Sequence, residues 1–109
     1  MRRDIAGSRH GDDEVRATIR SVHDEHGYLL DPHSAIAYLG LAGQGAPGVF
    51  LATAHPAKFA EIVEPVIGRR IQMPPPLLAA LATRRQILDL DATLEAVQEV
   101  VGHESFVDD

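Results

Sequence analysis

One short apolar run, Val49–Ala52, constrains the fold of this 109-residue chain more than any other feature. The run lies between a turn rich in glycine and proline and a later proline, which is typical of a strand buried on both faces of a parallel sheet. Such a strand needs neighbours on both sides, and the chain offers one further, weaker extended stretch at 86–88. We therefore expect a piece of a larger α/β sheet, with a small helical domain as the alternative.

The N-terminal part carries two strong helix signals. Three acidic residues at 12–14 precede apolar residues spaced at i, i+4 and i+7, and Gly27 follows them. Carboxylates favour the positive end of the helix dipole and glycine readily ends a helix, so we predict a first helix here. The pair Asp31-Pro32 combines a side chain suited to an N-cap with a proline suited to the first helical position. It predicts a second helix that turns three residues inward: Ala35, Ile36 and Leu39.

Proline residues mark the limits of the remaining helices. Pro56 begins a third helix, and we expect Pro65 to end or kink it because proline lacks an N–H and clashes with the preceding turn. A short helix around 77–81 and a last helix capped by Asp91 follow. We predict three parts: a loose lead-in at 1–11, a single α/β domain at 12–102 and an acidic tail at 103–109.

Charge and composition narrow the class of protein. The chain has a net charge of −6, one lysine and no cysteine. Nucleic acids and anionic membranes bind clustered Lys and Arg side chains, so we expect neither as a partner. Because disulfide bonds and thiolate chemistry need cysteine, the sequence excludes both. Since no apolar run reaches the length of a membrane span and the first residues lack the apolar core of a signal peptide, we expect a soluble, cytoplasmic domain.

Three motifs match functional patterns but are better explained as structure. The loop Gly43–Gly48 has the spacing of a dinucleotide-binding loop, yet a helix precedes it and a strand follows, which is the reverse of the order that motif requires. His23–His26 resembles a metal cluster, but nothing completes the three or four ligands that zinc needs, and the polar face of a helix explains it. Ser34 lies beside His33 and Asp31 only in sequence and not in the geometry of a catalytic triad. We assign no metal ligand and no catalytic residue.

Two longer segments are far more specific. They are Gly27–Ala35, with the sequence GYLLDPHSA, and Leu51–Phe59, with the sequence LATAHPAKF. In this order and separation they resemble the threonine synthase family of fold-type II pyridoxal phosphate enzymes, in which such segments lie near the C-terminus. The resemblance continues through Val63–Gly68 and the proline-rich connector, and covers most of residues 8–101. It implies a helix-rich C-terminal piece of such an enzyme, with Val49–Ala52 as its one buried strand.

The resemblance also implies a cofactor, pyridoxal phosphate, and one residue that binds it. In the family a hydroxyl residue at the end of a core strand bonds the pyridine nitrogen, and Thr53 stands at the matching position. A neutral hydroxyl suits this nitrogen because it need not stabilise a protonated ring. The alternative for Thr53 is the N-cap of the helix that begins at Pro56. Asp31 is either an acid near the cofactor ring or the N-cap of its own helix, and His33 and His55 are further candidates for the wall of that crevice.

The family's reaction converts O-phosphohomoserine and water into threonine and phosphate. Its Schiff-base lysine and the glycine-rich loop that holds the cofactor phosphate have no counterpart in this sequence. Lys58, the only lysine, matches a helix position instead, where exposure is the ordinary expectation. We therefore expect the chain to supply one wall of the cofactor site, to be inactive alone and to bind no pyridoxal phosphate covalently. Its partner would be the remainder of the enzyme or a second copy; the alternative is a stand-alone, non-catalytic module that acts in binding or oligomerisation.

Overall fold

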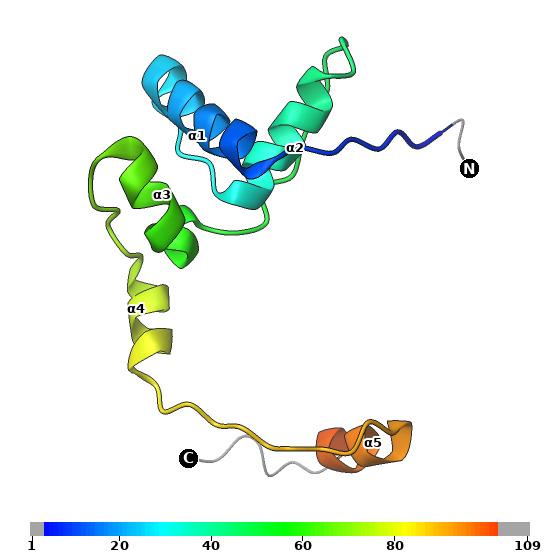
Figure 1. Ribbon diagram of the computed structural model, residues 1–109. Coiled ribbons are helices and arrows are strands. Elements are labelled where there is room, and N and C mark those ends of the chain that lie inside the picture. Colours follow the sequence, from blue (N-terminus) through cyan, green and yellow to red (C-terminus); the bar gives the residue numbers. More distant parts are fainter. Residues whose placement is uncertain (1–3, 103–109) are drawn as a thin grey trace. The chain divides into compact units, whose positions relative to one another are not determined.

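The computed structural model describes residues 4–102, which form six helical elements (Figure 1). The chain divides into two units, Met1–Leu78 and Ala79–Asp109. The predicted acidic tail, 103–109, lies outside the described residues. No helix in the described part is long and apolar enough to cross a membrane. The elements in chain order are α1 (Asp12–His26), α2 (Pro32–Ala42), the 3₁₀ helix η1 (Pro56–Phe59), α3 (Ala60–Ile67), α4 (Pro75–Ala82) and α5 (Leu94–Gly102).

Helix α1 confirms the first predicted helix. It ends at Gly27, whose φ of 66° is left-handed and whose N–H donates to the carbonyl of His23 at 2.9 Å. A residue with a Cβ would be strained in this conformation, which explains the glycine. The apolar residues of the i, i+4, i+7 pattern, Val15, Ile19 and Val22, are all buried.

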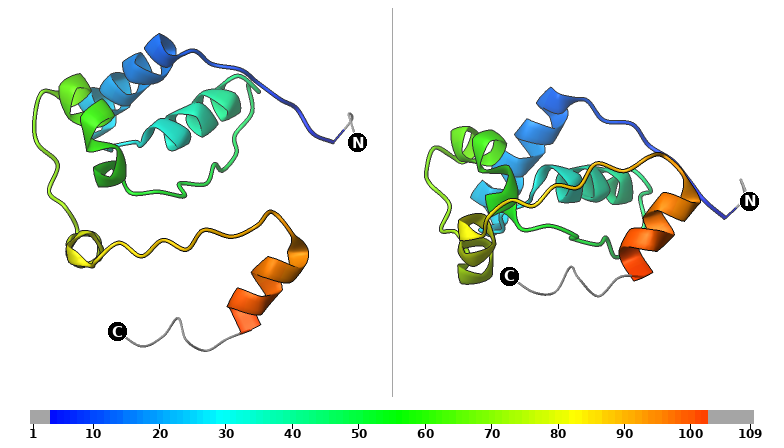
Figure 2. Two further views of the ribbon diagram at one scale, coloured as in Figure 1. Left: turned by 60° about the horizontal axis from the view of Figure 1, so that its bottom comes forward. Right: turned by 90° about the horizontal axis from the view of Figure 1, so that it is seen from below.

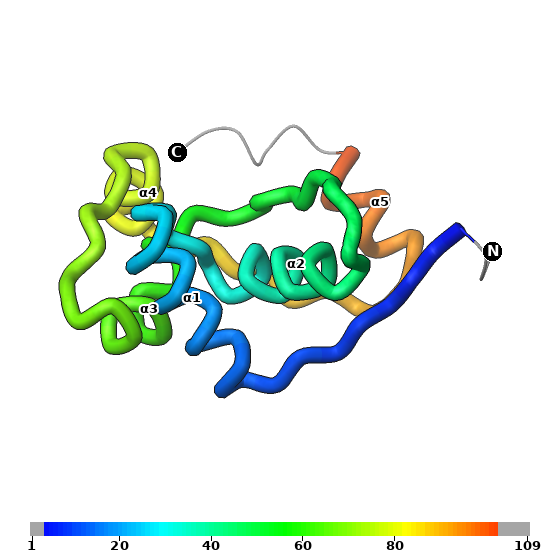
Figure 3. The backbone as a smooth tube through the Cα atoms, turned by 90° about the horizontal axis from the view of Figure 1, so that it is seen from above, coloured from blue at the N-terminus to red at the C-terminus, as the bar shows by residue number. Residues whose placement is uncertain are grey.

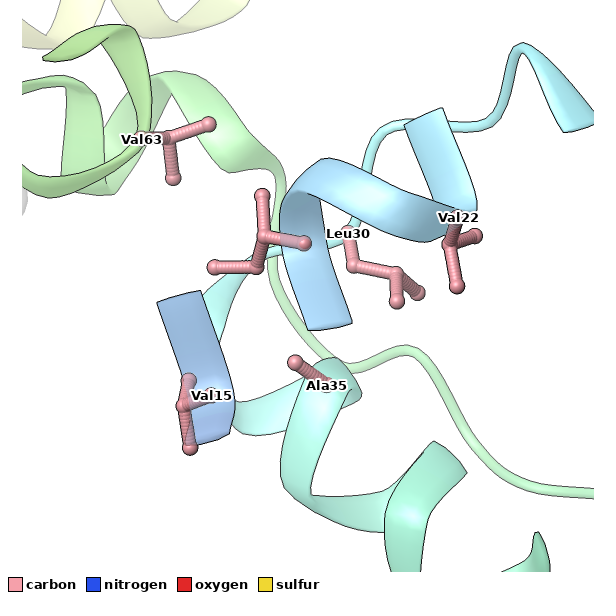
Figure 4. Packing of buried hydrophobic residues seen from close by; sticks show 6 residues of the cluster. Val15, Val22, Leu30, Ala35 and Val63 are labelled. Atoms are coloured by element: carbon pink, nitrogen blue, oxygen red, sulfur yellow. The ribbon is translucent and has the colours of Figure 1, made fainter. Parts of the chain in front are cut away.

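The core of the first unit lies where α1 packs against both α2 and α3, as Figures 2 and 3 show from several sides. Figure 4 shows its buried side chains pointing toward one another from separate elements. Ile36, which the sequence pattern placed inward, is 41% exposed. The inward face of α2 is therefore narrower than predicted. The core consists of Val15, Ile19, Val22, Leu30, Ala35 and Val63.

Helix α3 continues through Pro65 rather than ending there. It ends at Gly68, whose φ is 71° and whose N–H donates to the carbonyl of Glu64 at 2.9 Å. Pro65 is exposed, and so is Glu61, whose carbonyl would have accepted the missing N–H. Water can satisfy that carbonyl at the surface, so the helix tolerates the proline there.

The predicted buried strand at Val49–Ala52 is wrong. Residues 4–102 contain helices and irregular segments but no strand, so the α/β class is corrected to helical for this part of the chain. Val49 and Leu51 are 88% and 76% exposed. The weaker strand at 86–88 is also absent from the described residues. A strand is defined by hydrogen bonds to a neighbour, and no described segment pairs with either stretch.

The described part of the second unit is a short helical segment. Neither α4, which spans the boundary between the units, nor α5 contains a buried residue. Thr93, and not the predicted Asp91, caps α5: its hydroxyl oxygen accepts a hydrogen bond from the N–H of Ala96 at 3.3 Å. Asp91 accepts at its backbone carbonyl from the N–H of Thr93 at 2.8 Å.

Candidate functional site

Asp31 is a buried carboxylate at the start of α2, with 1% of its surface exposed. It accepts hydrogen bonds from the N–H of His33 at 3.0 Å and from the N–H of Ser34 at 3.2 Å. The Ser34 hydroxyl donates to the same carboxylate. The N-cap interpretation of Asp31 is therefore confirmed. The Ser34 hydroxyl was missed from the sequence, although a hydroxyl three residues after an N-cap aspartate is the spacing that allows this contact.

Burial, the largest single influence, raises the pKa of Asp31. The hydrogen bonds from the Ser34 hydroxyl, from the His33 backbone and ring and from the Ser34 N–H together outweigh it, so the pKa of Asp31 is lowered. The carboxylate is thus ionised at neutral pH and its oxygens are occupied. Asp31 serves to orient the N-terminus of α2 and offers little free surface to a ligand.

His33 connects the start of α2 to η1. Its Nδ1 lies 3.2 Å from the Asp31 carboxylate, and its ring packs against Phe59 with centroids 5.0 Å apart and an angle of 57° between the planes. Since an ionised carboxylate can only accept, Nδ1 is the nitrogen that carries the proton. The His33 side chain is 64% exposed. Its Nε2 is therefore the ring atom left to face solvent or a ligand.

Thr53 lies in the irregular segment that turns back after α2 and runs along that helix to η1 (Figures 2 and 3). Thr53 is exposed, and it does not cap η1. The cap is His55, whose Nδ1 accepts a hydrogen bond from the N–H of Ala57 at 3.1 Å. Pro56 is the first residue of η1, so the capping position falls on residue 55. The helix-cap alternative for Thr53 is wrong, and His55 has a structural role.

Lys58 is exposed near the end of η1. The Gly43–Gly48 segment is a loop that follows α2, which agrees with its rejection as a dinucleotide motif. A Cβ at Gly48 would lie 2.5 Å from Cδ1 of Leu41, so glycine allows the returning chain to pass close to α2. His23 contacts the Arg69 guanidinium through Nε2 at 2.8 Å. Among residues 4–102 no three His, Asp or Glu side chains are grouped so that they could hold a metal ion.

Two of the hollows that flank α2 in the first unit have largely apolar linings. One of about 480 Å³ lies between the end of α2 and the returning segment, and another of about 300 Å³ has an entirely apolar lining. Both are lined by Tyr38 and Phe50, whose rings meet edge to face with centroids 5.9 Å apart. Neither hollow is lined by Thr53, Asp31 or His33. These hollows therefore do not mark the residues that the sequence singled out.

Two of the sequence-predicted site residues, Asp31 and His33, form a connected cluster at the start of α2 together with Ser34, and Phe59 joins it from η1. His55 caps η1. Thr53 lies apart from this cluster. It is an exposed residue of the irregular segment that ends where η1 begins. The cluster can position the segment, and the threonine can offer one neutral hydrogen-bonding group to a bound molecule.

Comparison with known proteins identifies relatives for most of the chain. Residues 34–101 match the family model described as threonine synthase, C-terminal. The threonine synthase of Serratia marcescens is 43% identical over 88 residues, which is 78% of this chain and 19% of that protein. The threonine synthase of Escherichia coli is 44% identical over 66 residues, which is 58% of this chain and 15% of that protein. The chain thus spans about a fifth of the length of the curated relatives that it matches.

Two solved structures have the same fold over most of the chain. The crystal structure of Escherichia coli threonine synthase matches with a TM-score of 0.66 and 34% identity, covering 83% of this chain and 22% of that one. The pyridoxal phosphate-bound threonine synthase of Brucella melitensis matches with a TM-score of 0.61 and 42% identity, covering 86% of this chain and 21% of that one.

Proposed function

The chain belongs to the threonine synthase C-terminal family, and from this we propose that it is the C-terminal segment of a threonine synthase and forms one wall of the pyridoxal phosphate site. The complete enzyme would convert O-phosphohomoserine and water into threonine and phosphate. Two findings support this proposal: the family match at 34–101, and the small share of its relatives' length that the chain spans. The partner is then the remainder of the enzyme.

The exposure of the Thr53 residue is the observation that carries its assignment to the cofactor site. The capping role that would have occupied its hydroxyl belongs to His55, so in this proposal the hydroxyl binds the cofactor ring. Pyridoxal phosphate, when bound, supplies an electron sink. The Thr53 hydroxyl would donate to the pyridine nitrogen and leave that nitrogen unprotonated, because a neutral donor does not stabilise a charged ring as a carboxylate does.

The Asp31 cluster supports Thr53 from a distance. Asp31 fixes the ring of His33, and that ring contacts Phe59 at the end of η1. The cluster therefore holds the C-terminal end of the segment that carries Thr53. In this proposal Asp31 and His33 are positioning residues, and Lys58 takes no part because it lies on the exposed side of η1. The Schiff-base lysine and the phosphate-binding loop would come from the rest of the enzyme.

A chimeric enzyme tests the proposal. The matching C-terminal part of Escherichia coli threonine synthase, whose crystal structure covers 83% of this chain, is replaced by the 109 residues. We expect the chimera to retain pyridoxal phosphate and to release phosphate from O-phosphohomoserine. Thr53→Val should then weaken cofactor binding by roughly two- to tenfold, the effect of one neutral hydrogen bond. Thr53→Ser keeps a hydroxyl and serves as the matched control.

The same variants separate a cofactor role from a structural one. Because Thr53 is exposed and caps no helix, neither substitution should change thermal stability by more than about 0.5 kcal/mol. A loss of stability with unchanged cofactor affinity would remove Thr53 from the site. A chimera that retains no pyridoxal phosphate would refute the proposal as a whole.

A second candidate is a stand-alone, non-catalytic module that acts in binding or oligomerisation. The exposed side chains of Val49 and Leu51 favour it, since apolar groups at 88% and 76% exposure attract a partner surface. Sedimentation of the 109-residue chain distinguishes the two candidates. A discrete oligomer that Leu51→Gln dissociates would favour the module, and a monomer over a wide concentration range would favour the enzyme segment.

A further inference from the structure

Helix α5 has one apolar face and one polar face. At 100° per residue, five apolar residues fall within less than half of the helix circumference, and Glu95, Gln98 and Glu99 occupy the opposite side. Three of the apolar residues are largely exposed, with Leu94 at 67%, Val97 at 46% and Val101 at 79%. The apolar face is formed by Leu94, Ala96, Val97, Val100 and Val101.

Such a helix depends on packing against another surface. Isolated helices shorter than about 12–15 residues are marginal in water, and α5 has 9. No residue of α5 is buried, and the same holds for α4. The helix therefore presents an uncovered apolar face that nothing in the described part of its own unit covers.

The comparisons indicate what covers this face. The family model extends to residue 101 and so includes almost all of α5. The two structural matches cover 83% and 86% of the chain, which is more than the first unit contains, so each includes part of the second unit. Those enzymes are about five times longer than the matched region.

We propose that the apolar face of α5 is the surface through which the second unit docks onto the remaining part of a threonine synthase. The inference rests on the proposed function and names the contact that joins this chain to the rest of the enzyme. Since Glu95 and Glu99 lie on the side of α5 opposite the apolar face, the receiving groove should be apolar and the two glutamates should stay toward solvent.

Two substitutions at neighbouring positions test the docking face. Val97→Asn places an amide on the apolar face, and Gln98→Asn places the same residue on the polar face. Because Gln is a better helix former than Val, Gln98→Asn loses more helix propensity and is the stricter control. Both are made in the chimeric enzyme, and a glutamate-specific protease reports cleavage at Glu95 and Glu99, inside α5. We expect Val97→Asn to accelerate cleavage by about tenfold or more, because it weakens apolar burial, and Gln98→Asn to leave it within about twofold.

The isolated 109-residue chain provides the complementary measurement. There the remaining part of the enzyme is absent, so we expect both variants to be cleaved as fast as the unmodified chain. Equal cleavage of the two variants in the chimera would overturn the inference, while retained cofactor would leave the proposed function standing. Protection of α5 in the isolated chain that rises with concentration and disappears in Val97→Asn would make a second copy the occupant, and would also overturn it. A chimera that retains no cofactor would refute the proposed function, and the docking inference that rests on it.

Discussion

Replacing Asp31 with alanine should destabilise the first unit, because its side chain is buried and caps α2. The carboxylate is 1% exposed and accepts from two backbone N–H groups and from the hydroxyl of Ser34. Ser34 is itself 2% exposed. Water therefore cannot readily replace the lost acceptor, and the hydroxyl would be left without a partner inside the protein.

The expected magnitude follows from these contacts. Loss of an N-cap costs about 1 kcal/mol, and a buried hydroxyl left unsatisfied costs about 1–3 kcal/mol more. Asp31→Ala should thus lower the free energy of unfolding by about 2–4 kcal/mol, which corresponds to a fall in Tm of roughly 8–32 °C for a unit of this size. Ser34→Ala, which removes the donor and leaves the cap, should cost only about 1 kcal/mol.

Asp31→Asn isolates the charge from the shape of the side chain. The folded pKa of Asp31 is lowered from its ordinary value of 3.8, so its ionised form contributes stability above about that pH. This contribution is lost as the pH falls through the lower folded pKa. The stability difference between the unmodified chain and Asp31→Asn should therefore be complete at neutral pH and should shrink below pH 3.8.

Circular dichroism melts at several pH values, together with a double-mutant cycle between Asp31 and Ser34, provide the assay. Additive effects of Asp31→Ala and Ser34→Ala would show that the two side chains do not interact in the folded chain. A cost below about 0.5 kcal/mol for Asp31→Ala would refute the argument from burial. A difference from Asp31→Asn that is the same at pH 7 and pH 3 would refute the argument from charge.

Two further predictions concern the core and the lysine. Ile19→Ala should lower the free energy of unfolding in urea by about 2–5 kcal/mol, since Ile19 is fully buried, while Ile36→Ala should cost about 1 kcal/mol or less because Ile36 is 41% exposed; similar costs would contradict the assigned core. The 109-residue chain mixed with pyridoxal phosphate should show no Schiff-base absorbance and release no phosphate from O-phosphohomoserine. A stoichiometric absorbance that disappears in Lys58→Ala would make Lys58 a functional lysine.

The helices were predictable because their signals are local. The i, i+4, i+7 pattern of α1 and the pair Asp31-Pro32 act within a few residues, and their outcomes match the structure. The segment Val49–Ala52 has a pattern whose meaning depends on a partner strand. Its apolar side chains indicate burial, but burial and strand pairing need a second surface, and residues 4–102 do not provide one. An apolar run therefore predicts a strand only together with its neighbours.

The candidate site was predictable only in part for a similar reason. Sequence identified Thr53, Asp31, His33 and His55 and named the N-cap as one of two roles for Asp31, which the structure confirms. The cap that it offered as the alternative for Thr53 belongs to His55 instead, and the cofactor role of Thr53 stays a prediction. The proline that begins η1 fixes the capping position at residue 55, and a histidine ring nitrogen is as able to accept the bond as a hydroxyl is. The contact between His33 and Phe59 joins residues that are far apart in sequence, so no local sequence pattern predicts it.

The contact between His33 and Phe59 also determines where insertions and deletions can be accommodated. The two rings hold together the ends of a segment whose middle, from Gly43 to Thr53, has no regular structure. The entropy of closing a flexible loop rises only slowly as residues are added, by about 0.6 kcal/mol for each doubling. Insertions and deletions between Gly43 and Thr53 should thus be tolerated among relatives. One residue gained or lost between Asp31 and Ser34 would instead disrupt the N-cap of α2 and the contact that joins the two ends of the segment.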